Sequence, residues 1–272
     1  MKTIHVRKDN LSYWQQSSEQ LVVALGNFDG LHRGHCKVIE TAKKIADKKE
    51  LSLAVMSFFP HPKAVLGKGD DDFPYLMPLN KKVKILREMG VENFYIVEFT
   101  KNFASLSPEA FIEEYLINLG VQHVVAGFDF TYGCKGAGNM DKMKDYVADR
   151  IDITKVDKVV HRGEKIGSTG LRRRILAGHL EEVPYFLKRN YKTYCSWDGT
   201  VLKPDAYYIV PDEGTYYVTL KDEERVYHTS VQIVREGNHK ILRCSEKNLL
   251  MPTGNVIVEW HNRVTESRVV TV

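Results

Sequence analysis

The sequence lacks two features that would place a protein in a membrane or outside the cell. No segment has the roughly 20 consecutive apolar residues of a transmembrane helix, and the first residues, MKTIHVRKDNLSYW, lack the apolar stretch of a secretory signal. The cysteines Cys36, Cys134, Cys195 and Cys244 are widely spaced, with no C-x-x-C pair and no histidine cluster at metal-ligand spacing. We therefore expect a cytoplasmic protein with reduced cysteines, and we assign no residue as a metal ligand.

Strong net charge is also missing. The 39 lysine and arginine residues nearly balance 35 aspartate and glutamate residues, which leaves a formal charge of +4. Such a charge suits small anionic ligands but is weak evidence for nucleic-acid binding. The one dense basic run is LRRRI, which includes Arg172, and by itself it is typical of a solvated helix face. We expect small-molecule substrates, with neither nucleic acid nor a membrane as partner.

What the sequence does contain, between residues 20 and 188, is an alternation of apolar runs with helical patterns. The apolar runs cover residues 21–25, 51–58, 94–99 and 122–127, with a weaker fifth at 155–160. The helical patterns follow at 35–49, 80–90 and 107–120. Continuous apolar strands separated by helices are typical of a parallel sheet covered on both faces. This pattern predicts an α/β fold with a doubly wound parallel sheet.

The pattern changes after about residue 188. Short alternating runs such as GTYYVTL, RVYHTSVQIV and NVIVEW follow one another, separated by glycine, asparagine, aspartate and proline. This spacing is typical of antiparallel strands joined by turns. With 272 residues the chain is long enough for one domain of ordinary size and a smaller one. We predict an α/β domain over residues 1–188 and a small antiparallel β domain over 189–272.

The segment GNFDGLHRGH, residues 26–35, lies where the first apolar run gives way to a helix. Glycines let the backbone approach a ligand closely, and the first turn of a helix presents unpaired N–H groups to anions. His32 and His35 could donate hydrogen bonds to a phosphate whose charge rises during a reaction. They could instead be a loop cap and a polar residue of the first helical turn. If the strand order is flavodoxin-like, ligands bind after the first and fourth runs.

Four segments in order resemble a known family. GNFDGLHRGH is similar to the G-x-F-D-G-x-H-x-G-H signature of the FMN adenylyltransferase module of prokaryotic FAD synthetases, within the H-x-G-H nucleotidylyltransferases. FFPHP (58–62) is similar to F-x-P-H-P, GFDFTYG (127–133) to G-x-D-F-x-F-G, and IGSTGLR (166–172) to I-S-S-T-x-I-R. The resemblance covers most of residues 20–180. It implies a Rossmann-like domain that transfers AMP from ATP to FMN with Mg²⁺, giving FAD and pyrophosphate.

The resemblance also implies a role for individual residues. The proposed catalytic residues are His32, His35 and Arg172. The proposed ATP-binding residues are Gly26, Phe28, Asp29, Gly34, Ser168 and Thr169. The proposed flavin-binding residues are His61, Asp129, Phe130 and Tyr132. Alternatives remain, because Ser168 and Thr169 could be an ordinary helix cap, Phe130 could belong to the core, and His61 could mark a rigid turn. Gly167 replaces the family's first serine and removes one hydroxyl donor.

In bifunctional members of the family a riboflavin kinase barrel follows, marked near its start by G-x-G-F-P-T-A-N. The corresponding segment here, SWDGTVLKPDAYYIVPDEGTYYV, lacks that motif, and PTGN at 252–255 comes too late in the domain and is typical of a turn. We therefore expect an FMN adenylyltransferase without kinase activity, whose residues 189–272 form a small β-barrel-like domain that is a degenerate relative of the riboflavin kinase barrel, or else an unrelated β module. The alternatives are a bifunctional enzyme, an enzyme with another phosphate ester as acceptor, and a decayed flavin- or nucleotide-binding regulatory protein.

Overall fold

The computed structural model describes residues 1–17, 19–67, 73–147, 149–206, 208–237, 239–245 and 251–264. The strands are β1 (Lys2–Val6), β2 (Leu21–Leu25), β3 (Ser52–Phe59), β4 (Asn93–Glu98), β5 (Val121–Gly127), β6 (Thr131–Tyr132), β7 (Gly138–Asn139), β8 (Asp152–Val156), β9 (Val160–His161), β10 (Glu164–Lys165), β11 (Tyr191–Trp197), β12 (Leu202–Pro204), β13 (Gly214–Lys221), β14 (Val226–Glu236), β15 (His239–Cys244) and β16 (Gly254–Arg263). The helices are α1 (Leu11–Gln16), α2 (Arg33–Lys49), α3 (Pro62–Leu66), α4 (Leu79–Glu88), α5 (Lys101–Ala104), α6 (Pro108–Ile112), the π-helix η1 (Glu113–Ile117), the 3₁₀ turn η2 (Cys134–Gly136), α7 (Met140–Val147), α8 (Ser168–Ala177), the 3₁₀ turn η3 (Leu180–Glu182) and α9 (Val183–Leu187).

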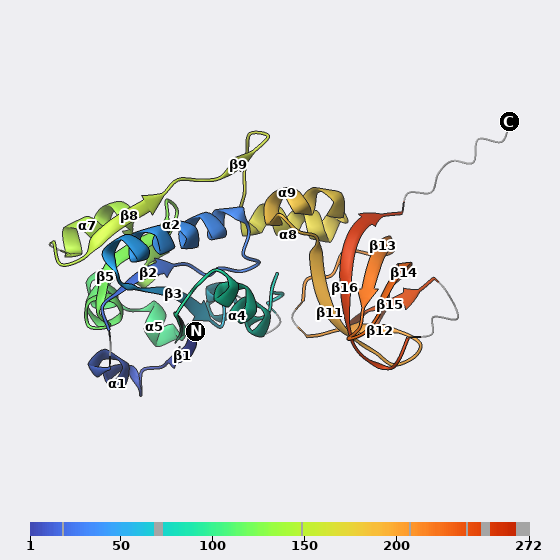
Figure 1. Ribbon diagram of the computed structural model, residues 1–272, viewed down its shortest axis with the longest axis horizontal. Helices are drawn as coiled ribbons and strands as arrows, with labels where there is room; N and C mark the ends of the chain where they lie inside the picture. Colours follow the sequence, from blue (N-terminus) through green and yellow to red (C-terminus); the bar gives the residue numbers. More distant parts are fainter. Residues whose placement is uncertain are drawn as a thin grey trace. The chain divides into compact units, whose positions relative to one another are not determined.

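The first part of the chain forms the predicted parallel sheet, with strand order β1-β4-β3-β2-β5-β8 (Figure 1). The order reverses between β2 and β5, whose carboxyl ends are level because Leu25 pairs with Ala126. A reversal of this kind is where open α/β sheets bind ligands. The expected site after the first and fourth apolar runs is therefore at the switch point. The order is Rossmann-like, as the family resemblance implies, because β2, β3 and β4 continue in one direction from the switch point.

The sheet is covered on both faces, as its continuous apolar strands require. Every residue of β2 is at most 2% exposed. On one face α2 and α4 pack against the strands, and α2 lies alongside β2 and β3 (Figure 1). On the other face the packed elements are α1, α6, η1 and α7. Burial on both faces explains why these strands contain an unbroken apolar run instead of an alternating one.

Two strands differ from the sequence prediction. The strand β1 was not predicted, because in KTIHV only Ile4 and Val6 are buried and the alternation is too short to stand out. It pairs in parallel with β4 at the sheet edge. The weak fifth run at 155–160 is in fact β8, which ends at Val156, followed by the hairpin of β9 and β10. Its start at Asp152 is polar because β8 is the other edge strand.

The second part of the chain forms a closed antiparallel barrel with strand order β11-β12-β15-β14-β13-β16. Along β16, buried Val256, Val258 and Trp260 alternate with partly exposed residues, as the period of two in the sequence predicts. The Trp260 ring nitrogen donates to the Thr193 hydroxyl at 3.0 Å. The predicted small β domain is thus a barrel, and closure leaves its main strands without free edges.

The chain divides into two compact units and passes from one to the other at three points. Unit 1 contains Met1–Phe73 and Met77–Lys165, and unit 2 contains Pro74–Leu76 and Ile166–Val272. The boundary predicted after residue 188 is close to the start of β11 at Tyr191. The units divide earlier because α8 and α9 pack with the barrel, where the Asp212 N–H donates to the Leu176 carbonyl at 3.0 Å. Within the described ranges, no helix is long and apolar enough to span a bilayer.

Candidate active site

The loop between β2 and α2, residues 26–32, turns sharply at the carboxyl end of the sheet. Phe28, Gly30 and Leu31 all have φ angles in the left-handed region, at 49°, 83° and 46°. Phe28 and Leu31 are buried, so packing holds these unfavourable angles. A side chain at Gly26 would come within 3.2 Å of the Phe28 ring, which explains the glycine. Non-glycine residues held in this region are concentrated at functional sites.

His32 is the N-cap of α2, as one of the two sequence interpretations proposed. Its Nδ1 accepts a hydrogen bond from the His35 N–H at 3.3 Å. Because Nδ1 is the acceptor, the neutral ring carries its proton on Nε2. Burial, followed by the charge of Lys165, lowers the pKa of His32 to about 4, although Asp129 opposes the shift. The cap therefore leaves a neutral ring whose Nε2–H can donate to a ligand, so the cap is compatible with the predicted phosphate contact, which stays a prediction.

His35 stacks on His32 with ring centroids 3.6 Å apart and an interplanar angle of 19°. Its ring also meets the Phe28 ring edge-on at 5.3 Å. Burial, and then the charges of His32, Lys82 and Lys165, lower the pKa of His35 well below its usual value. Its Nδ1 is buried and has no hydrogen-bond partner among the described residues. A buried polar atom without a partner is costly, and it is typical of a site that acts on a ligand.

We expect His32 to make the folded state sensitive to acid. With a pKa of about 4 in the folded chain and 6.5 when exposed, His32 binds fewer protons in the folded than in the unfolded chain between these values. The free energy of unfolding is thus fully retained above pH 6.5 and falls by up to about 3 kcal/mol as the pH drops to 4. His32→Asn keeps a good N-cap without this titration. Urea unfolding at pH 4 and 7 should show a smaller loss for the variant, and equal losses would contradict the assignment.

Lys82 is a site residue that the sequence analysis missed. It lies on the buried face of α4 and is 6% exposed. Its Nζ donates to the Asn27 carbonyl at 2.9 Å. Burial lowers the pKa of Lys82 to about 8, and the nearby Asp29 carboxylate partly opposes this shift. The signal in the sequence was a lysine in helical phase with Leu86 on an apolar face.

Asp29 joins the loop to the chain before α4. Its side chain is 2% exposed, and Oδ1 accepts a hydrogen bond from the Met77 N–H at 3.2 Å. The Ser57 hydroxyl and Lys82 both donate to the carbonyl of neighbouring Asn27. Asp29 thus acts through its position in the loop, and the predicted role in ATP binding stays a prediction.

The loop after β5 places a second ion pair near the histidines. Asp129 accepts a short hydrogen bond from Lys165, whose Nζ also lies 4.7 Å from the centre of the Phe128 ring. Both charges influence the pKa of His32, which indicates that this loop and the β2–α2 loop share one site. Lys165 was not predicted, although it directly precedes the IGSTGLR segment.

The other predicted flavin-binding residues differ in burial, since His61 caps a helix whereas Phe130 and Tyr132 pack in or against the core of the sheet. His61 is the N-cap of α3, where its Nδ1 accepts from the Lys63 N–H at 3.2 Å, and its ring stacks on Phe73 at 4.2 Å. Phe130 is partly buried against the sheet core. Tyr132 is buried in that core, with its ring 5.2 Å from the Phe111 ring. The predicted flavin contacts of His61, Asp129, Phe130 and Tyr132 stay predictions.

Tyr132→Phe tests the flavin role of Tyr132 directly. The Tyr132 hydroxyl is buried without a hydrogen-bond partner among the described residues. Since an unpaired buried hydroxyl is unfavourable, its removal should raise the free energy of unfolding by about 1 kcal/mol. We expect FMN affinity, measured by flavin fluorescence, to stay unchanged. Weaker FMN binding would instead assign the hydroxyl to the flavin.

The last predicted group lies on α8, in unit 2. Gly167 is the N-cap of α8, and no side chain caps the first turn, so Ser168 and Thr169 are not the cap that one sequence interpretation proposed. Gly34 has a similar place within the first turn of α2. An uncapped N-terminus of a ten-residue helix offers backbone N–H groups to an anion. Arg172 donates a short hydrogen bond to the Pro74 carbonyl.

Neutral histidines at a helix N-terminus, at the switch point of a Rossmann-like sheet, define a nucleotide-binding class of α/β protein. A family model described as FAD synthetase matches residues 14–170, which is more than half of the chain. The chain belongs to the FAD synthetase family. The fold, the four motifs and this match agree.

Relatives with established names support the same family. A protein of Bacillus subtilis named bifunctional riboflavin kinase/FMN adenylyltransferase is 40% identical over 240 residues, covering 84% of this chain and 76% of its own. A Listeria monocytogenes protein named FAD synthetase is 32% identical over 203 residues, covering 74% of this chain and 82% of its own. The first match is longer than the span of the family model, so the similarity continues beyond it.

A solved structure also matches. The crystal structure of a protein named macrolide-efflux protein, from Streptococcus pneumoniae, has a TM-score of 0.84 and 25% sequence identity. The match covers 99% of this chain and 94% of that one. Its fold therefore includes counterparts of both the sheet and the barrel.

Proposed function

We propose that this protein is an FMN adenylyltransferase that transfers AMP from ATP to FMN and has no riboflavin kinase activity. The observation that carries the proposal is the stacked His32–His35 pair at the N-terminus of α2, with one ring nitrogen of His35 unpartnered. The family match supports it. In the reaction an FMN phosphate oxygen attacks the α-phosphorus of ATP, the bond to the β-phosphate oxygen breaks, and pyrophosphate leaves.

The two histidines stabilise charge and do not accept a proton. Since both pKa values are lowered, both rings are neutral near pH 7 and serve as hydrogen-bond donors. Charge builds up on the phosphate oxygens as the bond to pyrophosphate breaks, so donors that are already in place lower the barrier. The first turn of α2 adds its backbone N–H groups. We assign His32 and His35 to the ATP phosphates.

The α8 residues are proposed for the leaving pyrophosphate. Ser168 and Thr169 stand at the first turn of a helix without a side-chain cap. Hydroxyls, backbone N–H groups and a guanidinium together suit a phosphate that carries several charged oxygens. Arg172 would exchange its hydrogen bond with the Pro74 carbonyl for a phosphate oxygen. Asp129 and His61 are assigned to the flavin side.

Mg²⁺ is proposed to enter with ATP. Among the described residues no group of three or more histidine, cysteine, aspartate or glutamate side chains could hold a metal. This fits an ion that is held largely by water and substrate phosphates, as Mg²⁺ commonly is. The ion would neutralise phosphate charge, while the residues above orient the phosphates. We further propose a cytoplasmic enzyme that binds neither nucleic acid nor a membrane.

The surroundings of the glutamates on the barrel strands support the proposed absence of riboflavin kinase activity. The kinase barrel of the family is also marked by a catalytic glutamate in a strand, and a glutamate that accepts a proton from a hydroxyl does so most effectively with a pKa near the operating pH. The glutamates on the described barrel strands are Glu236 and Glu259. Glu236 is paired with Arg243 at 2.7 Å.

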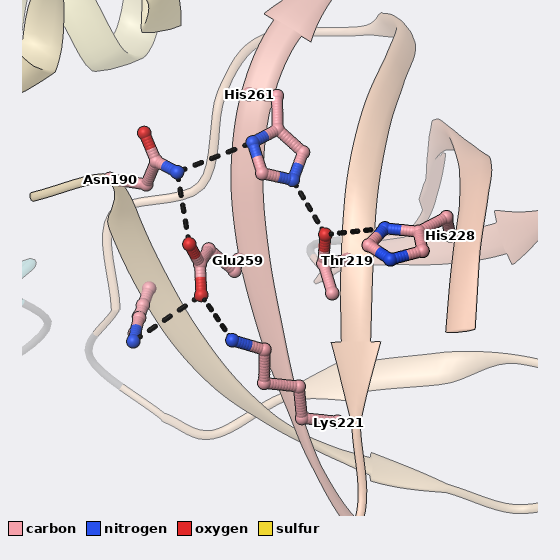
Figure 2. Close-up of polar contacts among 7 residues, drawn as sticks. Asn190, Thr219, Lys221, His228, Glu259 and His261 are labelled. Carbon is pink, nitrogen blue, oxygen red and sulfur yellow. Dashed lines mark hydrogen bonds and ion pairs between the residues drawn. The ribbon is translucent and has the colours of Figure 1, made fainter. Parts of the chain in front are cut away.

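Glu259 is also unsuited to act as a base (Figure 2). Its carboxylate accepts hydrogen bonds from Lys221 at 2.8 Å and Asn190 at 2.9 Å, and Lys192 lies at 3.3 Å. Burial alone would raise the pKa of Glu259, but these partners outweigh burial and lower it to about 2. On the same barrel face, Thr219 bridges His228 and His261. The face is a closed polar network whose acid is fixed in the ionised form.

One assay separates the possible functions. The purified protein is incubated with ATP, Mg²⁺ and FMN, and in parallel with ATP, Mg²⁺ and riboflavin, and the flavins are separated by chromatography. We expect FAD from FMN and no FMN from riboflavin. FMN formed from riboflavin would contradict the single activity and favour a bifunctional enzyme. No product in either reaction would favour a nucleotide-binding protein without activity.

A further inference from the structure

Unit 2 contains a pocket of about 600 Å³ at one end of its barrel. Three neighbouring strands, β12, β15 and β14, line it together with the chain that follows β12 (Figure 1). The strand β16, which carries Glu259, is three strands from β15 in the closed order, and none of the described residues that line the pocket belongs to the Glu259 network. Small-molecule sites commonly have volumes of about 300–1,000 Å³. The pocket is therefore large enough for a small ligand and is separate from that network.

Apolar side chains form much of the pocket wall. Ile209, Val210 and Ile241 line the pocket and are at most 6% exposed, so this wall is part of the packed barrel unit. Leu176, on α8, also lines the pocket but is 41% exposed. A ligand with an apolar body would remove part of this surface from water, which is favourable.

Most charged residues that line the pocket have partners within the protein. Lys203 pairs with an aspartate at 3.0 Å, and Glu236 pairs with an arginine at 2.7 Å. The Lys240 ammonium donates to two backbone carbonyls and one aspartate, at 2.9–3.2 Å. Asp205 also has a partner. These four side chains shape the pocket, and their charges are satisfied without a ligand.

Two donor side chains at the β14–β15 hairpin remain without a close acceptor in the described part of the chain. Arg235 lines the pocket with its side chain 60% exposed, and its Nε lies 3.6 Å from Glu213, which is too far for a hydrogen bond. The His239 side chain, which also lines the pocket, has no hydrogen-bond or ion-pair partner among the described residues. A guanidinium has five N–H groups and an imidazole at least one. The pocket thus combines an apolar wall with donors that lack acceptors.

We propose that this pocket binds a small amphipathic anion, with an apolar body against Leu176 and Ile241 and a phosphate or carboxylate group held by Arg235 and His239. A cation would be repelled by Arg235, and a neutral apolar ligand would cover donors without pairing them. An anion satisfies both parts of the pocket, and the planar guanidinium suits phosphate and carboxylate oxygens equally. The proposal is independent of adenylyl transfer and needs no kinase chemistry.

Three naphthalene compounds test the proposal on the unmodified chain. The probes 1-naphthyl phosphate, 1-naphthoate and neutral 1-naphthol share an apolar body and differ in charge. Each is titrated to millimolar concentration, and binding is followed by the NMR signals of the Val210 and Ile241 amides. We expect saturable shifts with the two anions and about tenfold weaker binding of 1-naphthol, because it lacks the charge-assisted hydrogen bonds. Tighter binding of the phosphate indicates a phosphate ester as ligand, and tighter binding of the naphthoate indicates a carboxylic acid.

Three substitutions locate the site. Arg235→Gln removes the cation, and we expect it to weaken binding of 1-naphthyl phosphate about tenfold. Arg225→Gln, at an exposed position between β13 and β14, removes the same charge away from the pocket and should leave the affinity unchanged. Ala206→Trp places an indole at the pocket from an exposed position and should abolish binding. Binding is measured without ATP or FMN, so a failure of the proposed function leaves this test intact.

Each outcome decides. Equal affinities of Arg235→Gln and Arg225→Gln for 1-naphthyl phosphate would overturn the proposal, as would equal binding of 1-naphthol and the two anions. Shifts confined to the β2–α2 loop, followed at the Gly26 and His35 amides, would place the probe in the candidate active site and also overturn it. The same holds if no pocket signal shifts at millimolar concentration. If Ala206→Trp does not fold, the two glutamine substitutions at exposed positions decide alone.

Discussion

Replacing His35 with alanine is expected to lower the turnover number for FAD formation by about 10²–10³-fold, the usual cost of losing one donor to a developing charge. The ring stacks on His32 and lies on the ATP side of the proposed site. The affinity for FMN should change much less, because the flavin is assigned to the loops that contain His61 and Asp129. Steady-state kinetics together with flavin fluorescence titration separate the two effects.

Cys36→Ala is the matched control for His35→Ala, since Cys36 is the next residue of α2 and is also partly buried. It should keep a turnover number close to that of the unmodified enzyme. Because the two histidine rings are in contact, His32→Asn and His35→Ala are expected to be non-additive in the double variant. An unchanged turnover number in His35→Ala would remove this residue from the mechanism.

Lys82→Met is expected to raise the free energy of unfolding and to lower the affinity for ATP. Burial makes the charged form of Lys82 less favourable in the folded chain, and its pKa is therefore lowered from 10.5 to about 8. This shift corresponds to about 3 kcal/mol, so methionine should raise the free energy of unfolding at pH 7 by an amount below that limit, since Asp29 loses a nearby cation. The loop also loses the hydrogen bond to Asn27, and we expect ATP affinity to fall about tenfold, as in other stability–activity trade-offs.

The stabilisation by Lys82→Met should depend on pH. Between pH 8 and 10.5 the unfolded chain holds the Lys82 proton more tightly than the folded chain, so the stability of the unmodified protein rises with pH. The advantage of Lys82→Met should therefore shrink over this range. Chemical unfolding of both proteins measures the difference, with Lys84→Met, an exposed position of α4, as the control. A loss of stability at pH 7 would contradict the interpretation of Lys82 as a costly functional residue.

The sequence predicted the sheet, the barrel and the family because the relevant signals are local. Apolar runs the length of strands and the H-x-G-H segment each depend on a few neighbouring residues. The loops after β2 and β5, which the sequence singled out, do lie at the switch point of the sheet. The local patterns alone left the strand order open, because the order depends on long-range pairing, and only the family resemblance implied the Rossmann-like order that the structure has.

The sequence could not predict hydrogen bonds between residues that are far apart in the chain and that the fold brings together. Lys82 and Asn27 are far apart in the chain, and so are Lys165 and Asp129. The sequence also presented the helix cap and the proposed phosphate contact of His32 as alternatives, whereas they are compatible because the cap uses only Nδ1. Tyr132 illustrates the opposite limit, since a motif position is mainly a core position here.

The three residues Pro74–Leu76 also bear on how such proteins can be divided or recombined. A chain cut between Lys165 and Ile166 would carry a buried leucine and a paired backbone segment away from the unit that holds them. The two units are thus not interchangeable cassettes, although the motifs in the sequence are arranged as if they were. A gene fission that respects the order of the motifs would still place Tyr75 and its bridge partner Tyr208 on different chains.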